Sequence, residues 1–219
     1  MTKTLGRSAA DFLPEKLDYP TLDKAAARCK GCDLYKNATQ TVFGEGDIAS
    51  RIMFVGEVPG DEEDLKGHPF VGPAGRLMDR AFEEVGIDRP RIYLTNAVKH
   101  FKWKPAGKRR LHERPKASEI AACEPWLRAE IMLVMPRIIV CLGATAAQTL
   151  LGKDFRITKM RGRWIDSPLA EKVTATMHPS SILRTPSHLR DQAYKDFVAD
   201  LRLVAKAMKA RELPNSPLP

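Results

Sequence analysis

The stretch RIMFVGE, residues 51–57, decides the fold of this chain. Its centre is an unbroken apolar run, which is typical of a strand buried on both faces. Three further runs have the same β-branched or apolar character: RIYLTNAV (91–98), RIIVCLG (137–143) and VTATMHP (173–179). The sequence therefore predicts a central four-stranded sheet that is covered on both sides.

Helical patterns alternate with these strands. They cover residues 74–86, 117–135 (with Pro125 marking a kink or an offset start), 144–152 and 188–212. This alternation predicts a parallel α/β sheet flanked by helices, within a single domain. A short helix with Thr21 as its N-cap is expected over 21–29, and a hairpin over ITKMRGRWI, 157–165. We expect an irregular arm over 1–20, the domain over 21–212 and a flexible tail over 213–219.

The composition suggests an anionic partner. The 219 residues are 43% hydrophobic, as in soluble globular proteins, and carry a formal net charge of +9. Nucleic acid is the first candidate for such a partner and an anionic membrane surface the second, while a basic protein without a polyanion partner remains the alternative. The sequence has neither a membrane-spanning run nor a secretory signal, so we expect a cytoplasmic, monomeric protein without a membrane partner.

Cysteine spacing points to a metal site. Cys29 and Cys32 form a C-x-x-C at the end of a predicted helix, Cys123 stands alone, and Cys141 lies inside a strand as a core residue. His100 is the candidate fourth ligand, or else a histidine with an ordinary partner at a strand end. Three cysteines and one histidine fit structural zinc and an Fe–S cluster equally well.

Polar residues gather at the carboxyl ends of the predicted strands, where open α/β sheets bind ligands. In GEVPGDEEDLKGHPFVGPAG, 56–75, glycines bracket Glu57 and allow close approach of a flat ligand. Phe70 either stacks on a base or anchors the loop on the core. Asn96 offers an amide to a base edge. HPSSILR, 178–184, supplies His178, hydroxyl groups and Arg184 for a phosphate.

The stretch GKRRLHERP, 107–115, places basic residues around His112 and has no apolar periodicity. Composition alone favours a solvated loop that contacts phosphate. The alternative is that His112 takes part in chemistry.

Several motifs together resemble those of a known family. The pattern GE-x-PG-x-x-ED…G-x-PFVG-x-AG, followed by LTNAVK and HPS, resembles the family-4 branch of the uracil-DNA glycosylase superfamily over nearly the whole chain. Two departures are similar to UdgX, the branch that becomes covalently attached to uracil-containing DNA. His100 stands where family 4 has a cysteine, and KRRLH, 108–112, matches K-R-R-I-H with one conservative change. Val58 departs from UdgX, which has glutamine there.

The resemblance implies a uracil-DNA glycosylase-like fold that holds a [4Fe–4S] cluster through Cys29, Cys32, His100 and Cys123. It implies that the enzyme excises uracil from DNA, with single strands preferred, and that His112 then bonds to C1′ of the abasic sugar in a single turnover. The implied catalytic residues are His112, Glu57, which orients His112, and His178, which stabilises the leaving base. The implied substrate-binding residues are Gly56, Val58, Asp61, Phe70, Asn96 and His178, and the DNA-binding residues are Lys108, Arg109, Arg110, Ser180 and Arg184.

Two alternatives remain open beside this reading. One is a conventional multiple-turnover family-4 glycosylase. The other is a non-catalytic, metal-containing nucleic-acid binder.

Overall fold

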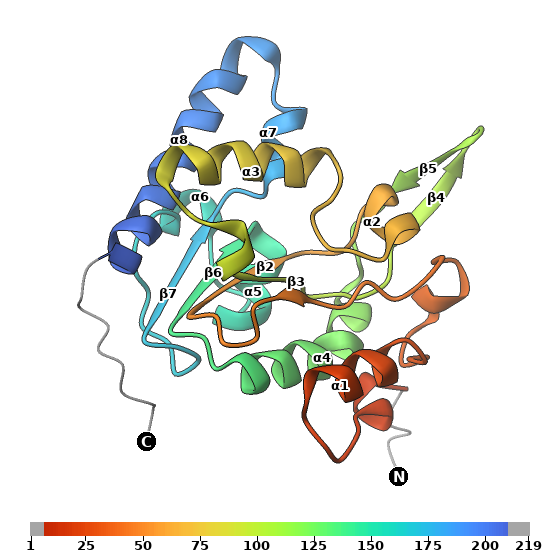
Figure 1. Ribbon diagram of the computed structural model, residues 1–219. Coiled ribbons are helices and arrows are strands. Elements are labelled where there is room, and N and C mark those ends of the chain that lie inside the picture. The colour runs from red at the N-terminus through yellow and green to blue at the C-terminus, as the bar shows by residue number, and fades with distance from the viewer. Residues whose placement is uncertain (1–6, 210–219) are drawn as a thin grey trace.

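The computed structural model describes residues 7–209, and its centre is a five-stranded sheet (Figure 1). The strand order is β1-β3-β2-β6-β7. The bounds are β1 Glu45–Gly46, β2 Ile52–Gly56, β3 Tyr93–Asn96, β6 Ile138–Leu142 and β7 Lys172–Thr176. The four predicted strands are all present and parallel. The four-stranded prediction is corrected by β1, a two-residue strand that pairs antiparallel with β3 and is too short to show a pattern.

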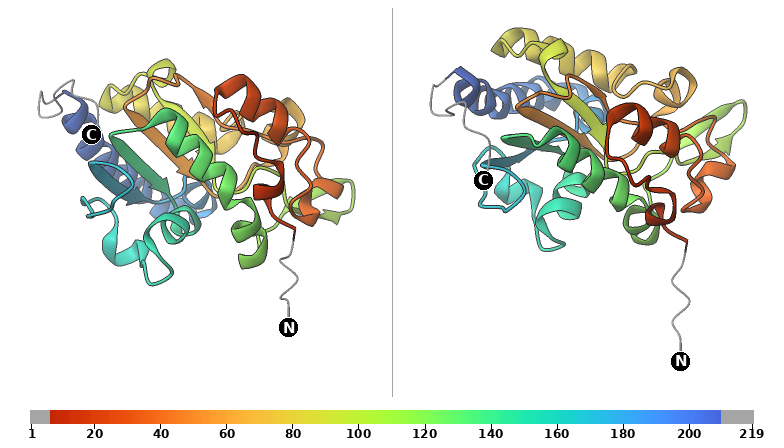
Figure 2. Two further views of the ribbon diagram at one scale, coloured as in Figure 1. Left: turned by 90° about the horizontal axis from the view of Figure 1, so that it is seen from below. Right: turned by 60° about the horizontal axis from the view of Figure 1, so that its bottom comes forward.

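The sheet lies between two layers of helices (Figure 2). The α-helices are α1 Tyr19–Ala26, α2 Asp61–Lys66, α3 Pro73–Val85, α4 Ala117–Val134, α5 Ala144–Leu151, α6 Ile157–Met160, α7 Pro179–Arg184 and α8 Ser187–Lys209. Three 3-10 turns, η1 Ala9–Phe12, η2 Asp33–Lys36 and η3 Arg89–Arg91, and a hairpin of β4 Trp103–Ala106 with β5 Arg109–His112 complete the described chain.

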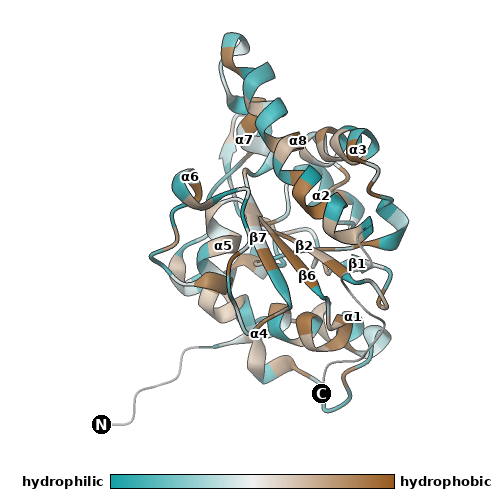
Figure 3. Cartoon of the chain, turned by 90° about the vertical axis from the view of Figure 1, so that its left-hand side faces the viewer, coloured by the Kyte–Doolittle hydropathy of each residue, from teal (hydrophilic) through white to brown (hydrophobic). Residues whose placement is uncertain are grey.

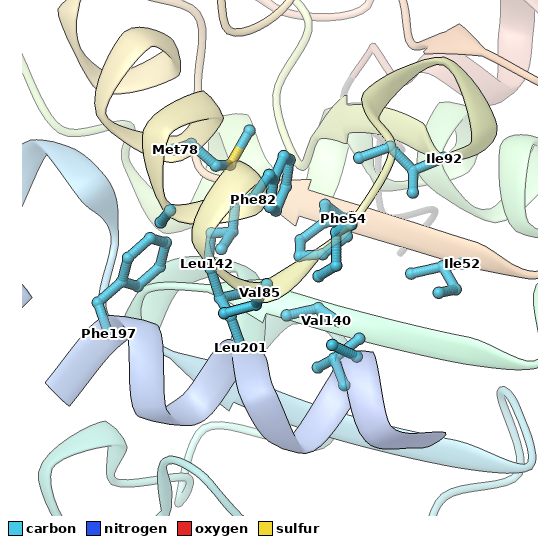
Figure 4. Packing of buried hydrophobic residues seen from close by; sticks show 14 of the residues in the cluster. Ile52, Phe54, Met78, Phe82, Val85, Ile92, Val140, Leu142, Phe197 and Leu201 are labelled. Atoms are coloured by element: carbon cyan, nitrogen blue, oxygen red, sulfur yellow. The ribbon is translucent and has the colours of Figure 1, made fainter. Parts of the chain in front are cut away.

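Strand alternation divides the core between the two faces of the sheet. Ile52 and Phe54 of β2 point toward α3 and α8, where they pack with Phe82 and Leu201 (Figure 4). Met53 and Val55 face α4 and α5. Figure 3 shows the apolar residues concentrated along β2 and β6, as burial on both faces requires. A third cluster joins η1, α1 and α4 and contains the predicted metal-binding cysteines.

Three local predictions differ from the structure. Asp18, rather than Thr21, caps α1, because its carboxylate accepts from the Thr21 N–H at 2.9 Å. The predicted hairpin at 157–165 is instead helix α6, followed by an extended segment in which Ile165 bridges Val173. The arm predicted as irregular over 1–20 contains regular structure in its described residues, since η1 packs on α4 and Ala9 is fully buried. The tail 213–219 lies outside the described residues.

The predicted basic loop is also different, because it forms the β4–β5 hairpin (Figure 1). Trp103 pairs with His112 and Ala106 with Arg109, and Gly107 at the turn has φ of 60°, which favours glycine. Both strands are mostly exposed, so the apolar alternation that marks half-buried strands is absent.

The strand order positions the site. From β2 the chain crosses to β3 on one side and then returns to β6 on the other side. Ligands bind at such a reversal, beyond the carboxyl ends of the strands. Among residues 7–209, no helix combines the length and apolar character needed to cross a membrane.

Candidate active site

A cavity of about 430 Å³ opens beyond the carboxyl ends of the central strands. This volume suits a small organic ligand. Eight residues predicted for the site line it: Val58, Asp61, Phe70, Asn96, His112, His178, Ser180 and Arg184. They come from segments far apart in the chain, so the fold brings together what the motifs predicted separately.

The inner end of the cavity depends on a close approach at Gly56. A β-carbon there would lie 2.3 Å from Asn96 Oδ1 and 2.7 Å from Phe70 Cζ. Glycine is therefore the residue type that lets the aromatic ring and the amide meet at the end of β2. Asn96 ends β3, is buried and lines the cavity, so its amide presents both a donor and an acceptor there.

Phe70 sits in a strained backbone conformation that its neighbours hold. Its φ is 56°, which is uncommon for an aromatic residue. Arg89 donates to the carbonyls of Pro69 and Phe70 at 3.2 and 3.1 Å, and Asp79 pairs with Arg89 at 2.5 Å. This strain is characteristic of functional loops. Arg89 was not among the residues predicted from the sequence, because it acts through backbone carbonyls from a distant turn.

Glu63 is a second residue of the site that was not predicted from the sequence. Its two carboxylate oxygens accept from the backbone N–H groups of Gly60 and Gly72 at 3.1 and 2.8 Å, and the residue is 7% exposed. It therefore ties together both ends of the loop that carries Phe70. The available signal was its position three residues after Gly60 at the start of α2, where a capping carboxylate is favoured.

His178 precedes helix α7, and its Nδ1 accepts from the Ser180 N–H at 3.2 Å. Accepting that bond requires a bare Nδ1, so the proton of the neutral ring is on Nε2. Burial, aided by the charge of Arg184 and by His112, lowers the pKa of His178 to about 4. The ring lies 6.2 Å from that of Phe70, at an interplanar angle of 31°. His178 is thus a neutral hydrogen-bond donor next to an aromatic surface.

His112 reaches the same cavity from the end of β5, with its ring 6.1 Å from that of Phe101. Burial lowers its pKa, while the charge of Glu57 partly opposes the shift. Its imidazole is therefore neutral at pH 7, with one nitrogen lone pair free for bonding. Glu57 Oε1 is buried without a hydrogen-bond partner, and Arg114 Nε lies 3.7 Å from it. Since this carboxylate has an oxygen without a hydrogen-bond partner and its charge acts on His112, Glu57 is a candidate proton acceptor for the imidazole.

Arg110 does not occupy the place expected of a DNA contact. Its guanidinium pairs with Asp61 and Asp64, each at 2.6 Å, and lies over the rings of Phe101 and Trp103. These contacts attach the hairpin to helix α2. The expected DNA contacts Lys108 and Arg109 lie at the exposed end of the hairpin. Arg110 is therefore a positioning residue, because alternation turns its side chain inward.

Three of the four expected metal ligands share the buried cluster between α1 and α4. Cys29 accepts from the Gly31 N–H at 3.4 Å, and Cys123 accepts from the Lys99 N–H at 3.3 Å. Burial raises the pKa of the Cys123 thiol to about 12 and also raises that of Cys32. Within residues 7–209, no three His, Cys, Asp or Glu side chains lie close enough together to hold a metal ion in the arrangement seen.

His100 is buried and bonds Thr41 Oγ1 through Nε2 at 3.0 Å. The Thr41 hydroxyl donates its proton to the Ala26 carbonyl, so it can only accept from the histidine. The proton is therefore on Nε2, which leaves Nδ1 free as a ligand atom. Burial lowers the pKa of His100 to about 4, so the ring is neutral. The donor chemistry of the four residues fits a metal or an Fe–S cluster.

Comparison with known proteins identifies the family. The profile described as "Uracil DNA glycosylase superfamily" matches residues 43–202. A type-4 uracil-DNA glycosylase of Thermotoga maritima is 44% identical over 162 residues, 74% of this chain and 81% of that protein. Proteins of the same name from Sulfurisphaera tokodaii and Archaeoglobus fulgidus are 40% and 37% identical, each over 77% of this chain and over 77% and 84% of their own length. The chain therefore belongs to the uracil DNA glycosylase superfamily and, within it, to the type-4 uracil-DNA glycosylases.

Proposed function

We propose that this type-4 enzyme excises uracil from DNA in the cavity formed by Phe70, Asn96 and His178. The observation that carries the proposal is the protonation of His178: a neutral ring with its proton on Nε2 faces the cavity beside Phe70. Such a donor stabilises negative charge as it develops on a uracil carbonyl. Phe70 offers a stacking surface, and the Asn96 amide can both donate to and accept from the polar edge of the base.

The base must leave the helix stack before it can enter this cavity. Flipping a base costs a few kcal/mol in a duplex and less in a single strand. We therefore infer a preference for single-stranded, uracil-containing DNA. The exposed Lys108 and Arg109 of the hairpin and Arg184 at the cavity would contact phosphates, with the salt dependence that such contacts bring.

Covalent capture by His112 is a second candidate function. The relatives are named type-4 uracil-DNA glycosylases, and this supports ordinary multiple turnover better than it supports capture. The specific observation in favour of capture is that the neutral imidazole of His112 lines the cavity. A UdgX-like activity thus rests on this residue and on the KRRLH hairpin.

The residues of the cavity and Glu57 account for each bond and proton in the capture reaction. The C1′–N1 bond of the nucleotide breaks, and uracil leaves as an anion stabilised by His178. A ring nitrogen of His112 then bonds to C1′, and the imidazolium that forms loses its other proton to Glu57. The neutral N-linked imidazole is a poor leaving group, so the protein would remain on the sugar. In ordinary turnover, water takes the place of the imidazole.

One experiment separates these reactions. The protein is incubated with a uracil-containing single-stranded oligonucleotide, and both free uracil and the mobility on a denaturing gel are measured. Capture predicts a shifted band that resists heat and detergent, and loss of that band in His112→Ala while uracil is still released. Ordinary turnover predicts free uracil without a shift. Salt-sensitive binding without any uracil release would instead indicate a non-catalytic nucleic-acid binder.

The matched control is His68→Ala, because His68 is an exposed histidine paired with Glu45 outside the cavity. Under either reaction this variant should behave as the wild type.

We also propose that Cys29, Cys32, Cys123 and His100 hold a [4Fe–4S] cluster. The support is the donor set: three thiols, two of them accepting backbone N–H bonds, and an imidazole whose tautomer leaves Nδ1 free. Bound there, the cluster would cross-link the N-terminal segment to α4. Iron and sulfide analysis tests this, and stoichiometric zinc in a colourless protein would contradict it. Thr41→Val should weaken metal retention about 10- to 100-fold, as loss of an outer-shell partner does.

A further inference from the structure

The cavity formed by Phe70, Asn96 and His178 is called the base cavity below. A second hollow, of about 490 Å³, adjoins it and is not used by the proposed chemistry. It lies between α3 on one side and α7 and α8 on the other. Pro73 and Leu183 line both hollows, so the second one continues from the mouth of the first. We call it the α3–α8 groove.

The groove has an apolar base and a cationic rim. Leu77 and Leu183 supply apolar surface, and Leu183 is 36% exposed, whereas the lining residue Ile182 is fully buried. Arg76, Arg80 and Arg190 stand around it, against one acidic residue, Asp191. The excess of positive charge suits a phosphate chain, and the apolar surface suits the face of a base.

Two of these guanidinium groups are available to a ligand. Arg76 is committed to Glu62 by an ion pair at 3.2 Å. In contrast, neither Arg80 nor Arg190 pairs with a carboxylate anywhere in residues 7–209. Arg190 donates only to the Thr185 carbonyl, and Arg80 lies 4.1 Å above the ring of Tyr194. The Tyr194 hydroxyl donates to Glu84, and this fixes the ring beneath Arg80. A guanidinium in this position still has N–H groups that can donate to an anion.

We propose that the α3–α8 groove binds the nucleotide next to the target uracil, with its phosphate on Arg80 and Arg190 and its base over Leu77 and Leu183. The inference rests on the proposed function, because it takes the base cavity as the uracil site. Its volume of about 490 Å³ lies in the range of small-molecule sites, so it has room for one nucleotide. In the view of Figure 1 the hairpin stands on the other side of α2, so the groove and the hairpin would hold the strand on opposite sides of the uracil.

The test measures affinity for single-stranded oligonucleotides by fluorescence anisotropy. Three ligands carry uracil with three nucleotides on its 5′ side only, on its 3′ side only, or on both sides. A 2′-fluoro group on the target sugar slows cleavage, so that binding is measured apart from chemistry. The variant is the double substitution Arg80→Ala with Arg190→Ala. The matched control is Lys195→Ala with Arg202→Ala, which removes the same charge from exposed positions of α8 that do not line the groove.

The flank that occupies the groove is either the 5′ or the 3′ one. The Arg80/Arg190 variant should lose about tenfold in affinity for the two ligands that carry this flank. It should bind the ligand that carries only the other flank with the affinity of the control variant. For the affected ligands, the slope of log affinity against log salt should fall by about 0.7, since Arg80 and Arg190 share one phosphate and each phosphate contact on a single strand contributes about 0.7. Equal losses with either flank, or losses matched by the control pair, would overturn the proposal.

Uracil release by the wild type is measured separately. If uracil is released but the variant shows no flank-dependent loss of affinity, only the proposal for the groove is refuted. If the variant shows that loss but the wild type releases no uracil, only the proposed function is refuted.

Discussion

Arg110 and His112 project from the same face of strand β5, and both contact Phe101, at 5.3 and 6.1 Å. The ion pairs of Arg110 with Asp61 and Asp64 fix that face against α2. The depth to which His112 enters the cavity is therefore set by its neighbour two residues earlier. Reactions that form a bond to a held group depend steeply on such positioning.

Arg110→Gln should consequently separate positioning from DNA affinity. The change releases the hairpin from α2, so the yield of any His112 adduct should fall at least about tenfold. The salt dependence of DNA binding should remain unchanged, because Arg110 faces carboxylates. Arg109→Gln, on the exposed face of the same strand, should do the reverse: the salt slope falls by about 0.7 while the adduct yield at saturating DNA is kept. Identical behaviour of the two variants would contradict the assignment.

Gly56→Ala should close the base cavity. The added methyl group would lie 2.3 Å from Asn96 Oδ1 and 2.7 Å from Phe70 Cζ, so one of these side chains must move. We expect uracil release to fall at least about a hundredfold, since catalytic groups tolerate little displacement. Binding to an oligonucleotide that already carries an abasic site should persist, because it needs no base in the cavity. Release at the wild-type rate would show that uracil does not sit at this end of the cavity.

The sheet was predictable from sequence because strands buried on both faces carry continuous apolar runs. β1 was not, since two residues carry no period. The β4–β5 hairpin was read as a loop because its residues are mostly exposed and nothing selects apolar alternation there. The prediction for 157–165 failed because a glycine at a turn does not reveal what precedes it, here a single helical turn.

The site was predictable where side chains themselves line the cavity, as those of Phe70, Asn96 and His178 do. It was not predictable where a residue acts through backbone groups far away in the chain. Glu63 and Arg89 shape the loop of Phe70 in this way, and their type and spacing resemble those of any surface charge. Arg110 shows a third limit, because a basic stretch does not reveal which arginines point inward.

Protonation of His178 should couple folding to pH. Its pKa is lowered from 6.5 to about 4, so the unfolded chain binds more protons between these values. Stability should therefore be complete above about pH 6.5 and should fall as the pH is lowered toward 4, by about 3 kcal/mol from this residue. Urea unfolding at several pH values measures the slope. His178→Gln should make it shallower, whereas His68→Gln, at an exposed site, should leave it unchanged; equal slopes in all three proteins would contradict the assignment.

Lys99 and Glu130 form a fully buried ion pair behind the base cavity. Glu130 also accepts from the Gly44 N–H at 2.9 Å and from Thr95 Oγ1, while Lys99 Nζ donates to the Asn96 carbonyl at 2.6 Å. Lys99→Met leaves a carboxylate buried without its cation, so we expect a loss of about 3–5 kcal/mol in the free energy of unfolding.

Adding Glu130→Gln removes that charge and keeps an acceptor for Gly44, so the double variant should be more stable than Lys99→Met alone. Chemical unfolding of the wild type, the two single variants and the double variant gives the coupling energy. If the two single effects on the free energy of unfolding add to within about 0.5 kcal/mol, the pair is not coupled. Because Lys99 also orients the end of β3, kcat/KM for uracil release should stay low in the double variant even where stability returns. Recovery of both together would make the ion pair a stabilising element without a part in placing Asn96.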